Sequence, residues 1–529
     1  MLKKVFAVIL SVIMILCVSL TVFAEDNESP PELHSGDFAS SDGSSMKPPE
    51  GQDGQPPEKP DGDGFAPSGG SSMTPPEGQD GQPPEKPDGD GFNLSDGGSQ
   101  AATNAGGAPG GTGGFGGGTP PGGSTSSFEY AASMEITEAD AQSGQTYTSD
   151  TADVSALMIS TADAVTVTDP TVTKTGDSDG GDNCNFYGLN AAVLVMGGSV
   201  TTITGGTIES SASGANGVFS YGGNSGRNGA DGDGTTVVIS DTAITTTGDG
   251  SGGIMTAGGG ITYAGNLTVN TSGRSSAAIR TDRGGGTVVV DGGTYTSNGL
   301  GSPAIYSTAE ITVKNAALFS NLSEGVCIEG KNSITLENCE LTANNTQCNG
   351  NATFLDTIMI YQSMSGDADS GTSSFTMTGG SLTSLSGHLF HVTNTHAVII
   401  LSGVTLVNEG SDILLSVCDD GWSGASNIAE MNADGQVLSG MILVGSDSSM
   451  SLSLMNGSSF TGTFSGEITN AKGTQVSAEL GSVSVTLDET STWTLTADTW
   501  ISEFSGNAAN VIGNGYTLYV NGSVLEGIS

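Results

Sequence analysis

One phrase decides the fold of this chain: Val313-Lys-Asn-Ala-Ala-Leu318, which returns further along as Leu336-Glu-Asn-Cys-Glu-Leu341. Its six positions are, in order, an apolar residue, any residue, one residue that is Asp, Gly or Asn, any two residues, and a second apolar residue. The other copies are Val167-Thr-Asp-Pro-Thr-Val172, Ile203-Thr-Gly-Gly-Thr-Ile208, Ile239-Ser-Asp-Thr-Ala-Ile244, Val290-Asp-Gly-Gly-Thr-Tyr295, Met377-Thr-Gly-Gly-Ser-Leu382 and Leu401-Ser-Gly-Val-Thr-Leu406. A phrase that recurs in this way indicates one structural unit stacked on itself.

The spacing of the copies indicates what this unit is. The shortest steps between their first apolar residues are of about 23 residues, which suits one rung of a parallel β-helix with its three short strands and turns. We expect the longer interval from Ile239 to Val290 to contain a degenerate copy at Leu267-Thr-Val269, and that from Leu336 to Met377 to split at Thr357-Ile-Met-Ile360. Insertions from Gly176 to Asn185 and from Gly222 to Gly234 can loop out of the two rungs that begin at Val167 and Ile203.

Alternation within the strands predicts which side chains face inward. In Thr287-Val-Val-Val-Asp291, Val288 and Val290 share one face, and the matching residues of the next rungs are Ile311 with Val313 and Ile334 with Leu336. The Asp, Gly or Asn that follows forms the corner, because these residues tolerate left-handed backbone angles. The chain is therefore predicted to be an all-β, right-handed parallel β-helix, with the handedness taken from the general rule for parallel crossovers.

The N-terminal part of the chain has a different amino-acid composition. Lys3 and Lys4 precede an apolar run that ends in Val22-Phe23-Ala24, so residues 1–24 are predicted to be a secretory signal peptide. An uncleaved membrane anchor is the alternative. Residues 25–127 are predicted to be a disordered linker rich in Pro and Gly, because they contain too few apolar residues to form a core. Within it, Ser44 to Gly70 and Ser71 to Gly98 form a tandem repeat.

The same pattern sets the remaining domain boundaries. We assign residues 128–440 to the parallel β-helix and residues 441–529 to the final rungs and a C-terminal cap.

The chain of 529 residues carries 57 acidic and 13 basic side chains, a net charge of −44, so it should repel nucleic acid and polyanionic glycans. Five cysteines follow the signal segment, with no CxxC motif and no dense spacing, which favours buried free thiols over a disulfide framework.

Several phrases of the chain resemble those of a known group. They are Gly181-Asp-Asn-Cys-Asn-Phe-Tyr-Gly188, Thr281-Asp-Arg-Gly-Gly-Gly286, Gly301-Ser-Pro-Ala-Ile-Tyr-Ser307, Ile360-Tyr-Gln-Ser363 and Val392-Thr-Asn-Thr-His396. Over about residues 130–529 the chain is similar to secreted adhesin-like β-helix proteins, of the pectin-lyase fold, from anaerobic Gram-positive bacteria. The resemblance implies a secreted or cell-surface β-helix, and it brings no catalytic residues with it.

The β-helix fold also houses pectate lyases, whose site needs an arginine as the base beside carboxylates that hold calcium. The candidate residues for such a site are Arg280, Asp282 and Arg283. The alternative is structural: Asp282 would pair with a flanking arginine, and the glycines 284–286 would shape a turn. We favour the alternative, because the chain lacks the basic groove that an anionic pectin requires.

Polygalacturonases share the fold and need aspartates that converge at hydrolysis distance. Asp419 and Asp420 are the candidate pair, with His388, His391 and His396 nearby in the sequence. However, these histidines precede the aspartates, which is the wrong order for that family, and no basic clamp follows. His396 also stands where the family's Asn-Thr-Asp phrase has an aspartate. The pair is therefore a weak catalytic candidate.

Acidic loops suggest a metal instead. Calcium prefers six to eight oxygen ligands, and three Gly-rich insertions contain spaced aspartates. The candidate ligands are Asp177, Asp179, Asp182, Asp231, Asp233, Asp367 and Asp369. None of the loops matches the twelve-residue calcium loop, so solvated acidic turns are the alternative. No other cofactor is expected.

Sugar binding commonly uses exposed aromatic side chains, and Trp422 and Tyr361 are the candidates here; a ring packed under a loop is the alternative. We therefore expect a non-catalytic, secreted or cell-surface β-helix for adhesion or glycan binding, whose partners are extracellular glycans or surface proteins. A membrane is a partner only if the N-terminal segment is uncleaved. The alternative functions are a pectate-lyase-like or polygalacturonase-like enzyme and an inert surface scaffold.

Overall fold

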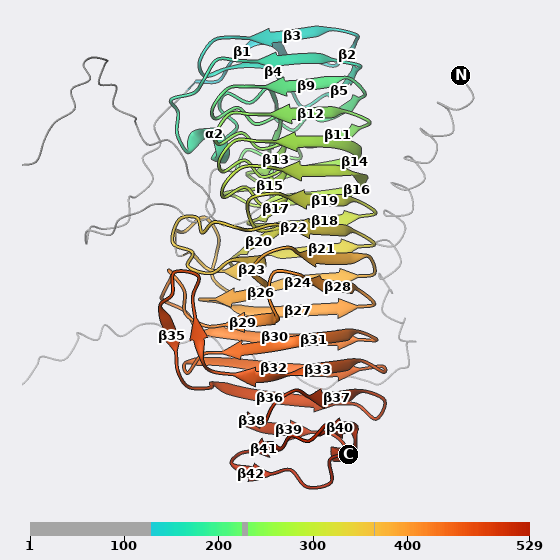
Figure 1. Cartoon of the computed structure of the whole chain (residues 1–529). Helices are drawn as coiled ribbons and strands as arrows, with labels where there is room; N and C mark the ends of the chain where they lie inside the picture. Colours follow the sequence, from blue (N-terminus) through green and yellow to red (C-terminus); the bar gives the residue numbers. More distant parts are fainter. Residues whose placement is uncertain (1–128, 225–230, 364) are drawn as a thin grey trace, which may run out of the picture. The chain divides into compact units, whose positions relative to one another are not determined.

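The computed structural model describes residues 129–224, 231–363 and 365–529. The predicted signal peptide and linker lie outside these residues. The described chain winds into a parallel β-helix, in which successive rungs place strands on three walls, A, B and C, in that order (Figure 1). The predicted all-β parallel β-helix is confirmed; its handedness stays a prediction.

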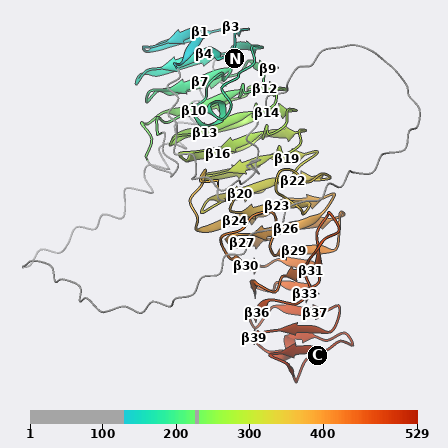
Figure 2. The same ribbon diagram turned by 90° about the vertical axis from the view of Figure 1, so that its left-hand side faces the viewer.

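Wall A is a 15-stranded parallel sheet, and its strands follow one another along the stack in Figure 2. The strands are β1 (Ala131–Ile136), β4 (Val154–Ser160), β7 (Val193–Met196), β10 (Val218–Tyr221), β13 (Ile254–Ala257), β15 (Ile279–Thr281), β17 (Ile305–Ser307), β20 (Val326–Glu329), β23 (Asp356–Tyr361), β26 (His388–Thr393), β29 (Ile413–Val417), β31 (Val437–Val444), β33 (Ser459–Ser465), β37 (Thr492–Leu495) and β40 (Val511–Ile512).

Walls B and C together form a 22-stranded sheet, in which β14 (Gly260–Thr271) and β16 (Gly286–Ser297) run through both walls. The other strands of wall B are β2 (Asp140–Ser143), β5 (Ala164–Thr168), β8 (Val200–Thr204), β11 (Thr236–Ser240), β18 (Glu310–Lys314), β21 (Ser333–Glu337), β24 (Thr372–Thr378), β27 (His396–Ser402), β30 (Asn427–Asp434), β32 (Ser448–Met455), β36 (Ser482–Leu487) and β39 (Glu503–Ser505). Those of wall C are β3 (Thr146–Ser149), β6 (Thr171–Lys174), β9 (Thr207–Ser210), β12 (Ala243–Thr246), β19 (Ala317–Ser320), β22 (Glu340–Ala343), β25 (Ser381–Ser384) and β28 (Thr405–Asn408).

The remaining elements are short. An α-helix, α2 (Asn183–Phe186), lies in the first long insertion, and a 3-10 helix, η1 (Ala508–Asn510), lies near the C-terminus. Two small sheets consist of β34 (Ile468–Thr469) with β35 (Gln475–Ser477), and of β38 (Thr499–Ile501), β41 (Leu518–Val520) and β42 (Ser523–Val524). Within the described residues, neither helix is long and apolar enough to cross a bilayer.

The repeated phrase marks the corner between walls B and C. Its first apolar residues lie in register from rung to rung: Val290 pairs with Val313, Val313 with Leu336, and Leu336 with Met377. Val290, Val313 and Leu336 each expose 0% of their surface, so the predicted inward ladder is confirmed. The corner residues have the expected left-handed backbone; φ is +53° at Asn315, for example.

The long intervals between copies of the phrase behave as predicted, with one exception. The interval from Ile239 to Val290 contains a rung at β14, where Ala264 pairs with both of these residues. The two rungs that carry insertions keep the ladder, since Val167 pairs directly with Ile203 and Ile203 with Ile239.

The exception is the interval from Leu336 to Met377. Its predicted split is wrong, because Leu336 pairs directly with Met377. Ile358 and Ile360 belong to β23 of wall A, so the extra residues lengthen one rung and add no further rung.

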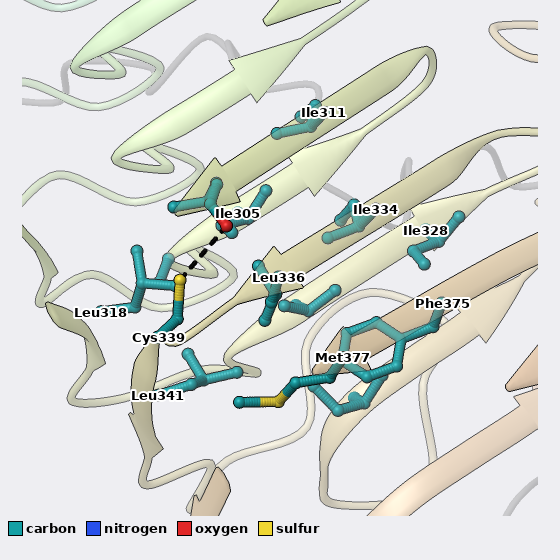
Figure 3. Packing of buried hydrophobic residues seen from close by; sticks show 14 of the residues in the cluster. Ile305, Ile311, Leu318, Ile328, Ile334, Leu336, Cys339, Leu341, Phe375 and Met377 are labelled. Atoms are coloured by element: carbon teal, nitrogen blue, oxygen red, sulfur yellow. Dashed lines mark hydrogen bonds between the residues drawn. The ribbon is translucent and has the colours of Figure 1, made fainter. Parts of the chain in front are cut away.

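The interior of the stack is a column of aliphatic and aromatic side chains. Figure 3 shows Ile311 above Ile334 on neighbouring strands of wall B, and Leu318 above Leu341 on neighbouring strands of wall C. Cys339 lies in this column and donates its thiol hydrogen to the carbonyl oxygen of Val313 at 3.3 Å. The cysteines of the described residues are free thiols, as expected, and Cys348 is the least buried of them.

On wall B, the first described rung carries polar side chains at its ladder positions. Asp140 and Gln142 pair with Val165 and Val167 and so occupy ladder positions that carry aliphatic residues in the second rung. Gln142 Nε2 donates to Asp140 Oδ2 at 2.6 Å.

Candidate functional site

From β4 to β29, wall A is buried on both faces. Its outward-facing residues include Arg280, Tyr306, Cys327, Met359 and His391, which lie in register on successive strands. Each of these residues exposes 4% of its surface or less. Long loops between the strands cover them, and the result is a second buried layer outside the column, which we call the outer layer.

The predicted lyase residues form internal pairs in the outer layer. Arg280 Nη2 lies 2.6 Å from Asp282 Oδ2, and both side chains are almost completely buried. Burial raises the pKa of Asp282 to about 6, although the guanidinium of Arg280 lowers it in part. The neighbouring Arg283 forms an ion pair with Asp367, and its guanidinium lies 3.7 Å above the ring centre of Phe186.

This geometry agrees with the structural alternative for these residues. Asp282 pairs with Arg280, and glycines 284–286 form a turn in which all three have positive φ. A base that abstracts a proton from a polysaccharide must reach a substrate in solvent. Arg280 is buried and its charge is already paired, so this arrangement does not present such a base.

The predicted hydrolase aspartates point to different partners. Asp420 Oδ1 accepts hydrogen bonds from the backbone nitrogen of Thr353 at 2.8 Å and from its hydroxyl at 2.6 Å. Asp420 Oδ2 lies 3.4 Å from His391 Nε2, beyond a normal hydrogen bond, and both side chains are fully buried. Asp419 instead accepts a hydrogen bond from Asn427 Nδ2 at 2.7 Å. The two carboxylates therefore do not converge on a common point in solvent.

Several groups around Asp420 act on its pKa. Burial acts to raise the pKa of Asp420, but His391 and the donors of Thr353 and Gly421 outweigh burial and hold the pKa below its usual range. His391 also stacks on Phe354 with ring centres 4.6 Å apart. Asp420 thus fastens the loop that carries Thr353 to the outer layer.

Three further buried acids were not identified from the sequence. Burial raises the pKa of Glu324 and Glu329, and it raises the pKa of Asp356 well above its usual range. Glu329 accepts hydrogen bonds from the hydroxyls of Tyr306 at 2.5 Å and Tyr361 at 3.1 Å. From strand alternation alone, Glu329 could have been predicted to lie on the outward face of wall A, as Cys327 does. The loop that covers it could not have been predicted.

The predicted exposed aromatic residues are buried, which corrects their assignment to a binding surface. Tyr361 exposes 0% of its surface and Trp422 exposes 6%, and their ring centres lie 4.9 Å apart. Both belong to an outer-layer cluster with Met359. The loop that carries Trp422 folds back over wall A, so this is the packed arrangement that we gave as the alternative.

The predicted calcium ligands do not come together. Asp367 and Asp369 pair with Arg283 and Lys331. Asp177 accepts a hydrogen bond from the backbone nitrogen of Ser213, and Asp233 accepts one from that of Thr235. Asp182 precedes α2, and Asp179 and Asp231 lie in the same two insertions. Among the residues that the structure describes, no three acidic, histidine or cysteine side chains form a group that could hold a metal ion.

An exposed aromatic row lies instead on the small sheet near the C-terminus. Trp500 pairs with Tyr519, and Tyr519 pairs with Val524, so the three residues cross β38, β41 and β42 in register. Trp500 exposes 52% of its surface and Val524 exposes 48%. The rings of Trp500 and Tyr519 are parallel within 3°, with centres 4.9 Å apart. We call these three residues the aromatic row.

The sequence contained a signal for this row. Thr499 and Ile501 are buried on either side of Trp500, so alternation in this short strand turns the indole outward. Trp493, by contrast, is completely buried and donates its indole hydrogen to the carbonyl oxygen of Gly462 at 3.1 Å. The terminal tryptophans are therefore not equivalent: one belongs to the core and the other to the surface.

Comparisons with known proteins add no relative. No family model, no curated protein and no solved structure matches this chain. The parallel β-helix is thus established by the strand register of the chain itself.

Proposed function

We propose that this chain is a non-catalytic, adhesin-like protein of the cell exterior that binds neutral glycans through the aromatic row. The stack of Trp500, which exposes 52% of its surface, on the half-buried Tyr519 carries the proposal, because an aromatic surface in solvent suits the apolar C–H faces of sugar rings. The location outside the cytoplasm rests on the predicted signal peptide at residues 1–24.

Two observations support binding over catalysis. Of the residues that a lyase or hydrolase would use, Arg280, Asp282 and the side chain of Asp420 are buried and hydrogen-bonded within the outer layer. The net charge of −44 disfavours anionic glycans such as pectin. A neutral glycan is not repelled by this charge, and its binding needs no catalytic residue.

Binding of the purified protein to an array of neutral and anionic oligosaccharides tests the proposal. We expect binding to neutral members, weakened by about tenfold or more in Trp500→Ala. Tyr263→Ala is the matched control, because Tyr263 is 43% exposed on wall B, away from the aromatic row.

Three outcomes contradict the proposal. If Trp500→Ala binds as well as the unaltered protein, the aromatic row is not the site. Release of reducing ends or unsaturated products that disappears in Arg280→Ala or Asp419→Ala would instead establish an enzyme. Absence of saturable binding would favour an inert surface scaffold.

A further inference from the structure

A solvent-open cavity of about 310 Å³ lies at the corner between walls A and B. It extends over three consecutive rungs, at the points where β24, β27 and β30 begin. The lining includes Thr372, Asn394, His396, Ser426 and Ile428. The cavity is separate from the aromatic row, and of its lining residues only His396 was considered above, beside the candidate pair Asp419 and Asp420.

Buried amides fix the walls of this cavity. Asn394, which exposes 2% of its surface, has a left-handed backbone with φ of +56°. Its Nδ2 donates to the carbonyl oxygen of Gln362 at 2.6 Å, and its Oδ1 accepts from the backbone nitrogen of Ala425 at 2.6 Å. One side chain thus joins the loop after β23 to the loop before β30.

A second amide extends this framework. Asn427 Oδ1 accepts a hydrogen bond from the backbone nitrogen of Asn394 at 2.7 Å, and Asn427 Nδ2 donates to Asp419 at 2.7 Å. Asp419, considered above as a catalytic candidate, therefore orients the amide that supports the cavity. A cavity held in this way costs little ordering when a ligand enters.

Besides the amides of Gln362 and Asn394, the polar side chains that line the cavity are hydroxyls and one imidazole. His396 Nε2 lies 2.8 Å from Glu430 Oε1, and its Nδ1 lies 3.5 Å from the Thr372 hydroxyl. The carboxylate of Glu430 orients the ring, so that Nδ1 and the Thr372 hydroxyl remain together at the cavity. The side chain of Ile428 supplies an apolar surface beside them.

The size and charge of the cavity limit what it can hold. Its volume is at the lower end of the range of about 300–1,000 Å³ that is typical of small-molecule sites. Its lining contains no lysine or arginine to neutralise an anion, and Glu430 lies beside it. A compact neutral ligand with several hydroxyl groups satisfies these conditions.

We infer that this cavity binds a single neutral monosaccharide unit, held by the Thr372 hydroxyl and His396 and packed against Ile428. A sugar ring offers hydroxyls that can both donate and accept, which matches a threonine hydroxyl and an imidazole oriented by a carboxylate. The C–H face of the ring covers the apolar wall.

Saturation-transfer NMR and calorimetry with glucose, galactose, mannose and N-acetylglucosamine test the inference on the whole protein. We expect millimolar or tighter binding of at least one sugar, weakened about tenfold in Thr372→Val and in His396→Ala. Thr378→Val is the matched control, because Thr378 lies on the same face of the same strand but outside the cavity. An unchanged melting temperature in each variant separates lost binding from lost folding.

Several results overturn the inference: no binding of any neutral monosaccharide, equal weakening in Thr378→Val, or tighter binding of glucuronic or galacturonic acid. The aromatic row is tested independently with Trp500→Ala, which should leave monosaccharide binding unchanged. Loss of binding in that variant would show that the sugar occupies the aromatic row and not the cavity. Conversely, monosaccharide binding by the cavity would stand even if the array finds no ligand for the aromatic row.

Discussion

The two faces of wall A bury their side chains by different means. The inner face presents Ile305, Val326 and Ile358 in register, and each is completely buried against other apolar side chains. On the outer face, Tyr306 hydrogen-bonds to the carboxylate of Glu329 in the neighbouring strand. One face therefore needs only apolar area, whereas the other needs a specific partner for each polar group.

This difference separates stability from specificity in the molecule. Each inner rung gains about 25 cal/mol per Å² of apolar surface removed from water, whichever aliphatic residue supplies it. A buried charge in the outer layer stabilises the fold only if its partner is present and correctly oriented. We expect the inner column to tolerate aliphatic exchange and the outer layer to tolerate almost none.

The largest expected effect follows from placing a charge in the inner column. Val313→Asp puts a carboxylate at a fully buried position without a partner, and we expect it to destabilise the protein by more than about 4 kcal/mol. Thr312→Asp is the control, because Thr312 lies on the same strand and faces outward. Urea unfolding followed by circular dichroism measures both, and similar midpoints would contradict the inward ladder.

A smaller effect is expected from breaking one outer-layer pair. Arg280→Met leaves Asp282 buried without its partner, and should cost about 3–5 kcal/mol in free energy of unfolding. The double variant Arg280→Met with Asp282→Leu should recover most of this loss, because no charge remains buried. As a comparison, Lys314→Met breaks the exposed pair with Glu337 and should change stability by less than about 1 kcal/mol. A double variant as unstable as the single one would show that packing, and not the charge, is decisive.

Counted per titrating group and per pH unit, the smallest effect is that of pH. Burial raises the folded-state pKa of Asp282 to about 6 and raises that of Asp356 well above its usual range. The folded protein then retains protons that the unfolded chain has already released, so the free energy of unfolding should fall as pH rises from about 4 to about 7, by up to about 1.4 kcal/mol per pH unit for each such group.

The variant Asp356→Asn isolates one of these groups. It removes a titrating carboxyl while keeping its shape, and should reduce the slope of stability against pH. Asp291→Asn, at an exposed corner, is the control. Unfolding midpoints measured across this pH range provide the test, and a stability that increases with pH would contradict the assignment.

The sequence predicted the ladder because its signals are local. Period-two alternation around Val290 and a corner residue such as Asn315 specify an inward face and a turn, and each copy supports the others. The extra rung predicted between Leu336 and Met377 was wrong, because Ile358 and Ile360 alternate in the same way but belong to wall A. Alternation identifies a strand but does not assign it to a wall.

The candidate site was less predictable, because burial in the outer layer depends on loops that are distant in the sequence. Tyr361 and Trp422 lie on different rungs, and only the loop after β29 brings their rings together. Similarly, Arg283 meets Asp367 across 84 positions. The outward direction of Trp500 could have been predicted from its strand alone, because its neighbours Thr499 and Ile501 are buried and side chains alternate along a strand.

By itself, the sequence determined the rung and its inward ladder, since both follow from sterics and hydrophobic burial between residues a few positions apart. Only the tertiary structure decided which face of wall A the loops cover, which acids lose their contact with water, and where a cavity remains open. Those outcomes depend on contacts between distant segments, whose closure no local pattern encodes.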